Sequence, residues 1–138
     1  MQIKFFDTLT ADAASIRTEV FVNEQGFKNE FGGEDNIATH AVLYAGKKPV
    51  ATCRFFEENG CRFVLGRIAV IKEFRGQGLG AEILRLAEKE IRLRGGREIY
   101  LHAQTRVKDF YAKLGYTPCG KPDFDEGCPH TPMHKLLT

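Results

Sequence analysis

Three glycines, Gly76, Gly78 and Gly80, separate a stretch typical of a strand from a stretch typical of a long helix. Residues 63–71 before them are mostly apolar. After them, apolar side chains recur at helical spacing from residue 79 to 91 among Glu and Arg. Glycines allow a tight turn in which successive backbone N–H groups face one concavity, and a helix N-terminus adds about half a positive charge. The pattern therefore predicts a strand–loop–helix unit whose loop, residues 75–81, binds a phosphate group.

The residues around this loop narrow the choice of phosphate ligand. A nucleoside triphosphatase loop needs Gly-Lys-Ser/Thr, whereas Ala81 follows the last glycine here. Gly76, Gly78 and Ala81 do match the dinucleotide-binding pattern. However, the next expected strand ends at Gln104 without an acid, and the chain is too short for the two halves of that fold. A flexible turn without a ligand is the other alternative, because a short glycine motif is weak evidence on its own.

The rest of the chain predicts a mixed sheet. Residues 39–71 contain three apolar runs joined by Gly46–Pro49 and by Asn59-Gly60, a strong hairpin signal, and so predict an antiparallel meander. A meander joined to a strand–helix–strand unit predicts an α/β (α+β) fold with a mixed central sheet of about six to seven strands and helices on both faces. The other expected elements are strands at 2–6, 99–103, 116–118 and 133–137, helices from Thr10 or Asp12 to about 22, at 79–94 and at 105–114, and a polar loop at 23–38 that could hold a short helix.

Composition limits the class of protein. The 138 residues, 43% hydrophobic and 28% charged, predict one globular domain spanning residues 1–138. A net charge of +2 gives no reason to expect a nucleic-acid partner. No apolar run is long enough for a membrane helix or a signal peptide, and none of the four cysteines forms a C-x-x-C pair. We therefore expect a cytoplasmic protein with free thiols and no membrane partner.

Two stretches resemble the motifs of one known family. The run from Leu65 to Ala81, which includes Arg75-Gly76-Gln77-Gly78-Leu79-Gly80-Ala81, resembles the central motif of the GNAT superfamily of N-acetyltransferases. Residues 104–116 resemble its second motif, with Gln104 where Asn is usual and Val107 where Ala is usual. Lys72 also replaces a common Pro before the loop. Further segments resemble the ElaA-like branch of the family, at residues 17–25, 35, 40, 103–104, 127–130 and 133.

The resemblance implies a GNAT fold and the transfer of an acetyl group from acetyl-CoA to a primary amine. It implies that the glycine loop holds the pyrophosphate of the cofactor and that a bulge in the preceding strand frees backbone N–H groups for the thioester. It also implies that Tyr111 is the general acid that protonates the leaving thiolate. The cofactor-binding set expected from the resemblance is Ile68, Ala69, Val70, Arg75, Gly76, Gln77, Gly78, Leu79, Gly80, Ala81, Gln104 and Tyr111.

The group that deprotonates the attacking amine is less clear from the sequence. A lysine-like amine has a pKa near 10.4, so only about one molecule in a thousand is neutral at pH 7, and a base would help. The strand at 63–71 has no carboxylate. Glu24 and His40 lie in segments that usually line the acceptor side, and we take both as candidate catalytic residues. The wider pool of candidate bases is Asp35, Glu57, His102 and His130.

The expected mechanism is direct attack in a ternary complex, because no cysteine lies in the setting of a catalytic nucleophile. We expect no metal, since Cys119, Cys128, His130 and His134 lack the paired cysteine arm of structural zinc sites. The acceptor could be a small-molecule amine or an amine of a protein or peptide, and a homodimer stays open. The alternatives are an acyl-CoA-binding sensor or structural module without turnover and a nucleotide-binding protein.

Overall fold

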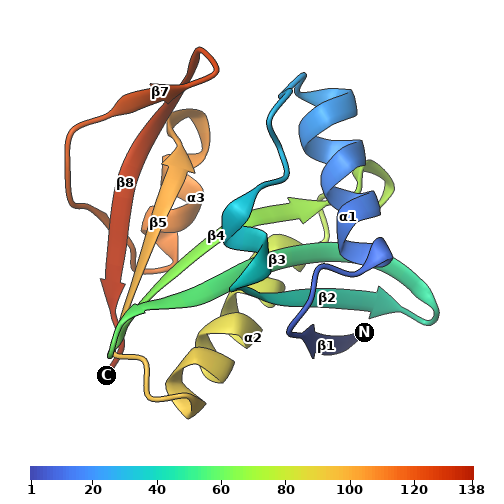
Figure 1. The fold of residues 1–138 in the computed structure, drawn as a ribbon. Coiled ribbons are helices and arrows are strands. Elements are labelled where there is room, and N and C mark those ends of the chain that lie inside the picture. Colours follow the sequence, from blue (N-terminus) through green and yellow to red (C-terminus); the bar gives the residue numbers. More distant parts are fainter.

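Eight strands form one sheet in the computed structural model, which describes residues 1–138 (Figure 1). In chain order they are β1 (Gln2–Phe6), β2 (Thr39–Ala45), β3 (Lys48–Asn59), β4 (Arg62–Val70), β5 (Glu98–Gln104), β6 (Thr117–Pro118), β7 (Asp123–Asp125) and β8 (Cys128–Leu136). Their order in the sheet is β1-β2-β3-β4-β5-β8-β6, and β7 pairs with β8. Only the β4–β5 pair is parallel. The predicted mixed α+β sheet is confirmed, with β7 as a strand that the sequence did not indicate.

Three α-helices, one π-helix and three 3₁₀ segments complete the fold. They are α1 (Ala11–Arg17), the π-helix η1 (Thr18–Glu24), the 3₁₀ segments η2 (Gly33–Asn36), η3 (Lys72–Phe74) and η4 (Thr105–Val107), α2 (Leu79–Leu93) and α3 (Lys108–Lys113). Helices α1 and α2 lie on opposite faces of the β2–β4 part of the sheet, as predicted (Figure 1). No helix is both long enough and apolar enough to span a membrane.

The two long helices form where the apolar spacing places them. In α2, the apolar side chains of Ile83, Leu84 and Ile91 are fully buried against the sheet. The first helix begins at its predicted cap, because the Thr10 hydroxyl accepts the backbone N–H of Ala13 at 3.2 Å. Its second half differs from the expectation, since it winds as a π-helix. Short π segments are rare and often lie at functional sites.

The antiparallel meander of β2, β3 and β4 is confirmed, but its second turn is shifted by one residue. Asn59 still pairs with Arg62, so the turn consists of Gly60 and Cys61. Only Gly60 has a positive φ, of 56°, while Asn59 keeps the strand conformation. The Asn-Gly signal therefore located the hairpin correctly and its central residues wrongly.

The segment 23–38 contains η2, as the sequence allowed, yet two of its acids are buried rather than solvated. Arg17 donates to Glu30 through Nε and to Asp35 through Nη1, at 2.8 Å in both cases, and Arg54 donates to Asp35 at 2.7 Å. Burial alone would raise the pKa of Asp35, but the hydrogen bonds from the two guanidinium groups outweigh it and hold the pKa well below its usual range. This ion cluster fastens the segment to the sheet.

Strands β4 and β5 diverge soon after they meet. Their parallel pairing covers only residues 62–64 of β4 and 98–100 of β5. Beyond Val64, the edge of β4 that faces β5 has no partner strand, while β5 continues alongside β8. An unpaired strand edge presents free N–H and C=O groups, so the gap between the two strands can receive an extended ligand.

Candidate active site

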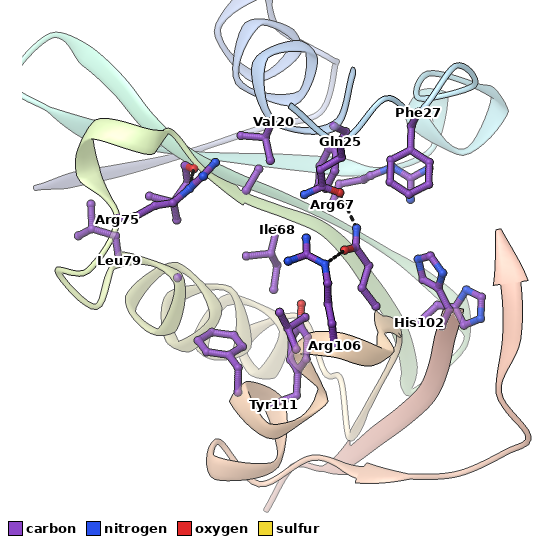
Figure 2. Close-up of a pocket in the computed structure, with 18 of the residues that line it drawn as sticks. Val20, Gln25, Phe27, Arg67, Ile68, Arg75, Leu79, His102, Arg106 and Tyr111 are labelled. Atoms are coloured by element: carbon purple, nitrogen blue, oxygen red, sulfur yellow. Dashed lines mark hydrogen bonds between the residues drawn. The ribbon is translucent and has the colours of Figure 1, made fainter. Parts of the chain in front are cut away.

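A cavity of about 510 Å³ opens where β4 and β5 diverge (Figure 2). Its walls come from the bulged part of β4, the glycine loop and the start of α2, the end of β5, η4 with α3, and the end of the first helix. In Figure 2, Arg75 and Leu79 lie at one end of the cavity and Phe27 and His102 at the other. One concave site therefore joins the glycine loop to the segments expected on the acceptor side.

The glycine loop forms an anion cradle at one end of this cavity. Gly76 and Gly78 have φ angles of 80° and 77°, a conformation that favours glycine. A Cβ on either glycine would meet no atom within 4 Å, so the space above the loop is open. The backbone N–H groups of residues 76–81 have no acceptor in the protein, and they lie at the N-terminus of α2. These features fit a pyrophosphate group.

A bulge in β4 lies beside the cradle. Thr52 pairs with Ala69 and Arg54 pairs with Gly66, so residues 67 and 68 together face the single residue 53. Arg67 has a φ of 55°, which is unusual for a residue with a side chain. The resemblance implied such a bulge before the loop, and β4 has one at this position.

The bulge region directs one backbone N–H group into the gap between the strands. Ile71 donates its N–H to Val50 on β3, so by strand alternation the N–H of Val70 faces away from β3. Ala69 faces β3 by the same alternation. Of the three N–H groups at 68–70 expected to face the thioester, Val70 is the one whose direction follows from the pairing.

Tyr111 comes from α3 and lines the same cavity. Its ring packs edge-on against Phe110 and Tyr116, with centroid distances of 5.0 and 6.0 Å. Burial raises the pKa of the Tyr111 phenol well above its ordinary value, and no hydrogen bond contributes to that shift. The hydroxyl is therefore protonated throughout the neutral range and is free to donate.

A chain of hydrogen bonds crosses the cavity at Gln104. The Nε2 group of Gln104 donates to Gln25 at 2.7 Å, and Arg106 Nε donates to Gln104 Oε1 at 2.9 Å (Figure 2). The bridge links the end of β5 to the end of the first helix. Gln104, predicted to contact the cofactor, does line the cavity, and both ends of its amide are engaged within the protein.

Arg75 and Glu24 are engaged with each other. Arg75 donates through Nε to the Val70 carbonyl at 2.9 Å and through both terminal nitrogens to the Glu24 carboxylate. The hydrogen bond from Arg75 lowers the pKa of Glu24, which makes the carboxylate a weaker base. Glu24 does not line the cavity. The structure therefore does not bring this candidate base to Tyr111.

His40, the second candidate base, is fully buried outside the cavity. Its Nε2 lies 3.0 Å from the Asp35 carbonyl oxygen, so this nitrogen carries the proton in the neutral ring. Its Nδ1 is buried without a hydrogen-bond partner. The ring is thus part of the packing around the ion cluster and has no access to the cavity.

Two histidines from the wider pool do line the cavity, and a residue that the sequence did not single out joins them. His102 Nε2 lies 2.6 Å from Asp123 Oδ1, and the His102 ring stacks on His130 at 4.8 Å. Asp123 reaches this position because β7 pairs with β8. No local sequence signal indicates a three-residue strand at this point. No group of three or more His, Cys, Asp or Glu side chains is arranged to hold a metal ion.

Comparisons with known proteins agree with this geometry. A family model described as an acetyltransferase (GNAT) domain matches residues 7–137. The chain is 38% identical over 127 residues to YjcF, an uncharacterised N-acetyltransferase of Bacillus subtilis, and the match covers 90% of each protein. A crystal structure of a candidate N-acetyltransferase from Lactobacillus plantarum superposes with a TM-score of 0.92 and 31% identity, covering 99% of this chain and 98% of that one. ElaA of Escherichia coli superposes with a TM-score of 0.84 at 22% identity, covering 97% of this chain and 99% of that one, and thus shares the fold.

Proposed function

The chain belongs to the GNAT family and is an acyl-CoA-dependent N-acetyltransferase, and on that premise we propose that it transfers the acetyl group of acetyl-CoA to a primary amine by direct attack in a ternary complex. The main support for this proposal is the anion cradle formed by the glycine loop. Residues 76 and 78–81 of the cradle, whose N–H groups have no acceptor in the protein, line the same cavity as Tyr111, whereas Gln77, also predicted to contact the cofactor, does not line it. One bound molecule with a pyrophosphate and a reactive thioester could therefore contact both.

The binding part of the proposal rests on two features of the backbone. The N–H groups of the cradle are oriented donors for the pyrophosphate, and hydrogen bonds to charged groups contribute about 1.5–3 kcal/mol each. The free edge of β4 beyond Val64 can pair with the amide groups of an extended pantetheine arm. Arg75 supports the cradle indirectly, because its guanidinium holds the Val70 carbonyl and Glu24 together beside the loop.

The chemical part assigns roles to two groups of this chain. Acetyl-CoA, when bound, supplies an acetyl group activated as a thioester. The N–H of Val70 is positioned to stabilise the negative charge that develops on the carbonyl oxygen during attack. Tyr111 gives its phenolic proton to the sulfur as the carbon–sulfur bond breaks and regains a proton from the newly acylated nitrogen. No covalent acyl-enzyme step is needed, because no cysteine lines the cavity.

A release assay for free thiol tests the proposal. Acetyl-CoA is incubated with the protein and a panel of aliphatic amines, polyamines, amino sugars, amino acids and short peptides with free amino groups. We expect turnover with at least one class, together with the acetylated amine identified by mass. Binding of acetyl-CoA without turnover of any amine would instead support a sensor or structural module. Displacement by NAD or ATP, but not by CoA, would support a nucleotide-binding protein.

A further inference from the structure

The acceptor end of the cavity contains a histidine that is already paired with a carboxylate. His102 points from β5 and lines the cavity, and its Nε2 lies 2.6 Å from Asp123 Oδ1. Because Nε2 faces a carboxylate, it carries the proton in the neutral ring, and Nδ1 is left with a free lone pair. A carboxylate in this position fixes the tautomer and stabilises the ring once it is protonated.

The His130 ring stacks against one face of the His102 ring. The two imidazoles stack with centroids 4.8 Å apart and planes 29° apart. His130 is 7% exposed, and its Nδ1 lies 2.9 Å from the Cys128 carbonyl, which fixes its own neutral tautomer. The stacking therefore keeps the His102 ring in place beside Asp123.

The other charged groups of the cavity are less suited to accept a proton from the acceptor. Glu30 shares one carboxylate oxygen between Arg17 and Arg67, and Asp125 on β7 is exposed to solvent. Arg106 contributes a positive charge and no lone pair. The charged and titratable groups that line the cavity together with His102 are Glu30, Arg67, Arg75, Arg106, Tyr111, Asp125 and His130.

We infer that His102, oriented by Asp123 and His130, is the general base that deprotonates the acceptor amine. This inference rests on the proposed acetyl transfer. His102 touches the acceptor and is a catalytic residue in this scheme. Asp123 and His130 act through it and are positioning residues.

His102 and Tyr111, on opposite sides of the cavity, together account for every proton that moves in this reaction. His102 Nδ1 takes one proton from the ammonium group, and the freed nitrogen lone pair forms the bond to the acetyl carbon. The carbon–sulfur bond breaks, with its electron pair on sulfur. Tyr111 gives its proton to the sulfur and regains one from the nitrogen, which becomes the amide. One proton stays on His102 and passes to solvent, since the side chain is 39% exposed.

Four variants test the inference by their pH profiles of kcat/KM, measured with an amine from the panel that the wild type acetylates. His102→Gln should lower kcat/KM near pH 7 by roughly 10²–10⁴-fold and remove the lower inflection, leaving a rate that climbs toward about pH 10 as free amine accumulates. Asp123→Asn should lower kcat/KM near pH 7, because an amide no longer holds the proton on His102 Nε2 and leaves the lone pair on Nδ1.

Two controls match these changes. His134 forms a similar pair with Glu98 at 2.9 Å outside the cavity, so His134→Gln should keep the wild-type profile. Glu98→Gln removes the carboxylate of that same pair outside the cavity and should also leave the profile in place. Thermal melts and acetyl-CoA affinity establish that each variant is folded. If His102→Gln does not fold, the kcat/KM of Asp123→Asn near pH 7 decides, because Asp123 is exposed and its substitution should not disturb folding.

The outcomes distinguish a failure of the acetyl-transfer proposal from a failure of the inference about His102. A wild type that acetylates no amine between pH 6 and 10 overturns the acetyl-transfer proposal and this inference with it. A wild type that turns over, while His102→Gln and Asp123→Asn retain its profile, overturns the inference alone. Loss of the inflection in His102→Gln and a lower kcat/KM in Asp123→Asn, with both controls unchanged, establish His102 as the base.

Discussion

Tyr111 shows how the surroundings of a single side chain decide its chemistry. Burial raises the pKa of its phenol, so the group stays protonated at neutral pH and is a weak acid on its own. In the proposed mechanism a weak acid is sufficient as a donor, because the acylated nitrogen that forms in the same step is a far stronger acid and would return the proton. On that proposal the phenol would pass a proton from nitrogen to sulfur without ionising before the reaction.

Tyr111→Phe should lower kcat by roughly 10²–10⁴-fold, the usual contribution of general acid catalysis. The affinity for acetyl-CoA should change little, because the phenylalanine ring keeps the contacts with Phe110 and Tyr116. Steady-state kinetics and a binding titration measure the two effects. Tyr100→Phe, which removes a hydroxyl outside the cavity, serves as the control. A kcat within about twofold of wild type in a chemistry-limited assay would make Tyr111 a packing residue.

At the scale of elements, the site depends on the glycine loop and the first turn of α2 acting as one unit. Gly76 and Gly78 turn the chain so that the N–H groups of the loop and of the helix start face the same space. The strand before the loop contributes Val70, and Arg75 ties that strand to the end of the first helix through Glu24. Backbone groups, rather than flexible side chains, therefore form most of the proposed cofactor site.

Gly78→Val should abolish acetyl-CoA binding, because its Cβ would project into the open space above the cradle. A β-branched residue at a φ of 77° also costs about 1–3 kcal/mol of strain. Gly46→Val separates the two effects, since Gly46 has a φ of 62° and equally open space in the β2–β3 turn, away from the cavity. Calorimetric titration should show lost affinity for Gly78→Val alone. Equal affinity in both folded variants would exclude the loop as the pyrophosphate site.

Elements with local signals could be predicted from the sequence, and contacts between distant segments could not. The meander and α2 follow from apolar periodicity, and the cradle follows from its glycines. Asp123 meets His102 only because β7 pairs with β8, and the three residues of β7 have no periodicity of their own. Glu24 had a plausible position along the chain, but its partner Arg75 lies 51 residues away. The position of the glycine loop beside the cavity was therefore easier to predict than the contacts of the candidate bases.

For the whole molecule, the buried ion cluster joins the N-terminal third of the chain to the sheet. Arg17 and Arg54 approach Asp35 from a helix and from a strand, and Glu30 adds Arg67 of the bulge to the same network. Removing one member of a buried ion pair leaves the other charges without a partner, which is strongly destabilising. The cluster therefore fixes the position of segment 23–38, which borders the acceptor end of the cavity, as part of the overall fold.

Asp35→Asn should lower the free energy of unfolding at pH 7 by about 3–5 kcal/mol, as for other broken buried pairs. The pKa of Asp35 is lowered in the folded state, so its contribution is complete above the unfolded value of about 3.9 and is lost as the pH falls below it. Urea unfolding between pH 7 and pH 3 should show a flatter acid slope for the variant. Glu73→Gln, which breaks the exposed pair with Lys48, should have little effect. A wild-type slope in Asp35→Asn would contradict this account.

The short pairing of β4 with β5 has a mechanical consequence. Only three residue pairs join the β1–β4 half of the sheet to the β5–β8 half, so this seam is where the two halves can flex against each other. A pantetheine arm lying along the free edge of β4 would form hydrogen bonds in place of the missing pairing with β5. It would thereby restrict motion between the two halves of the sheet. Amide hydrogen exchange at Val70 should slow when acetyl-CoA is added, whereas Val42 in the middle of β2 should exchange at the same rate with and without it. The molecule would then be most rigid once the acetyl donor is in place and before the amine reacts.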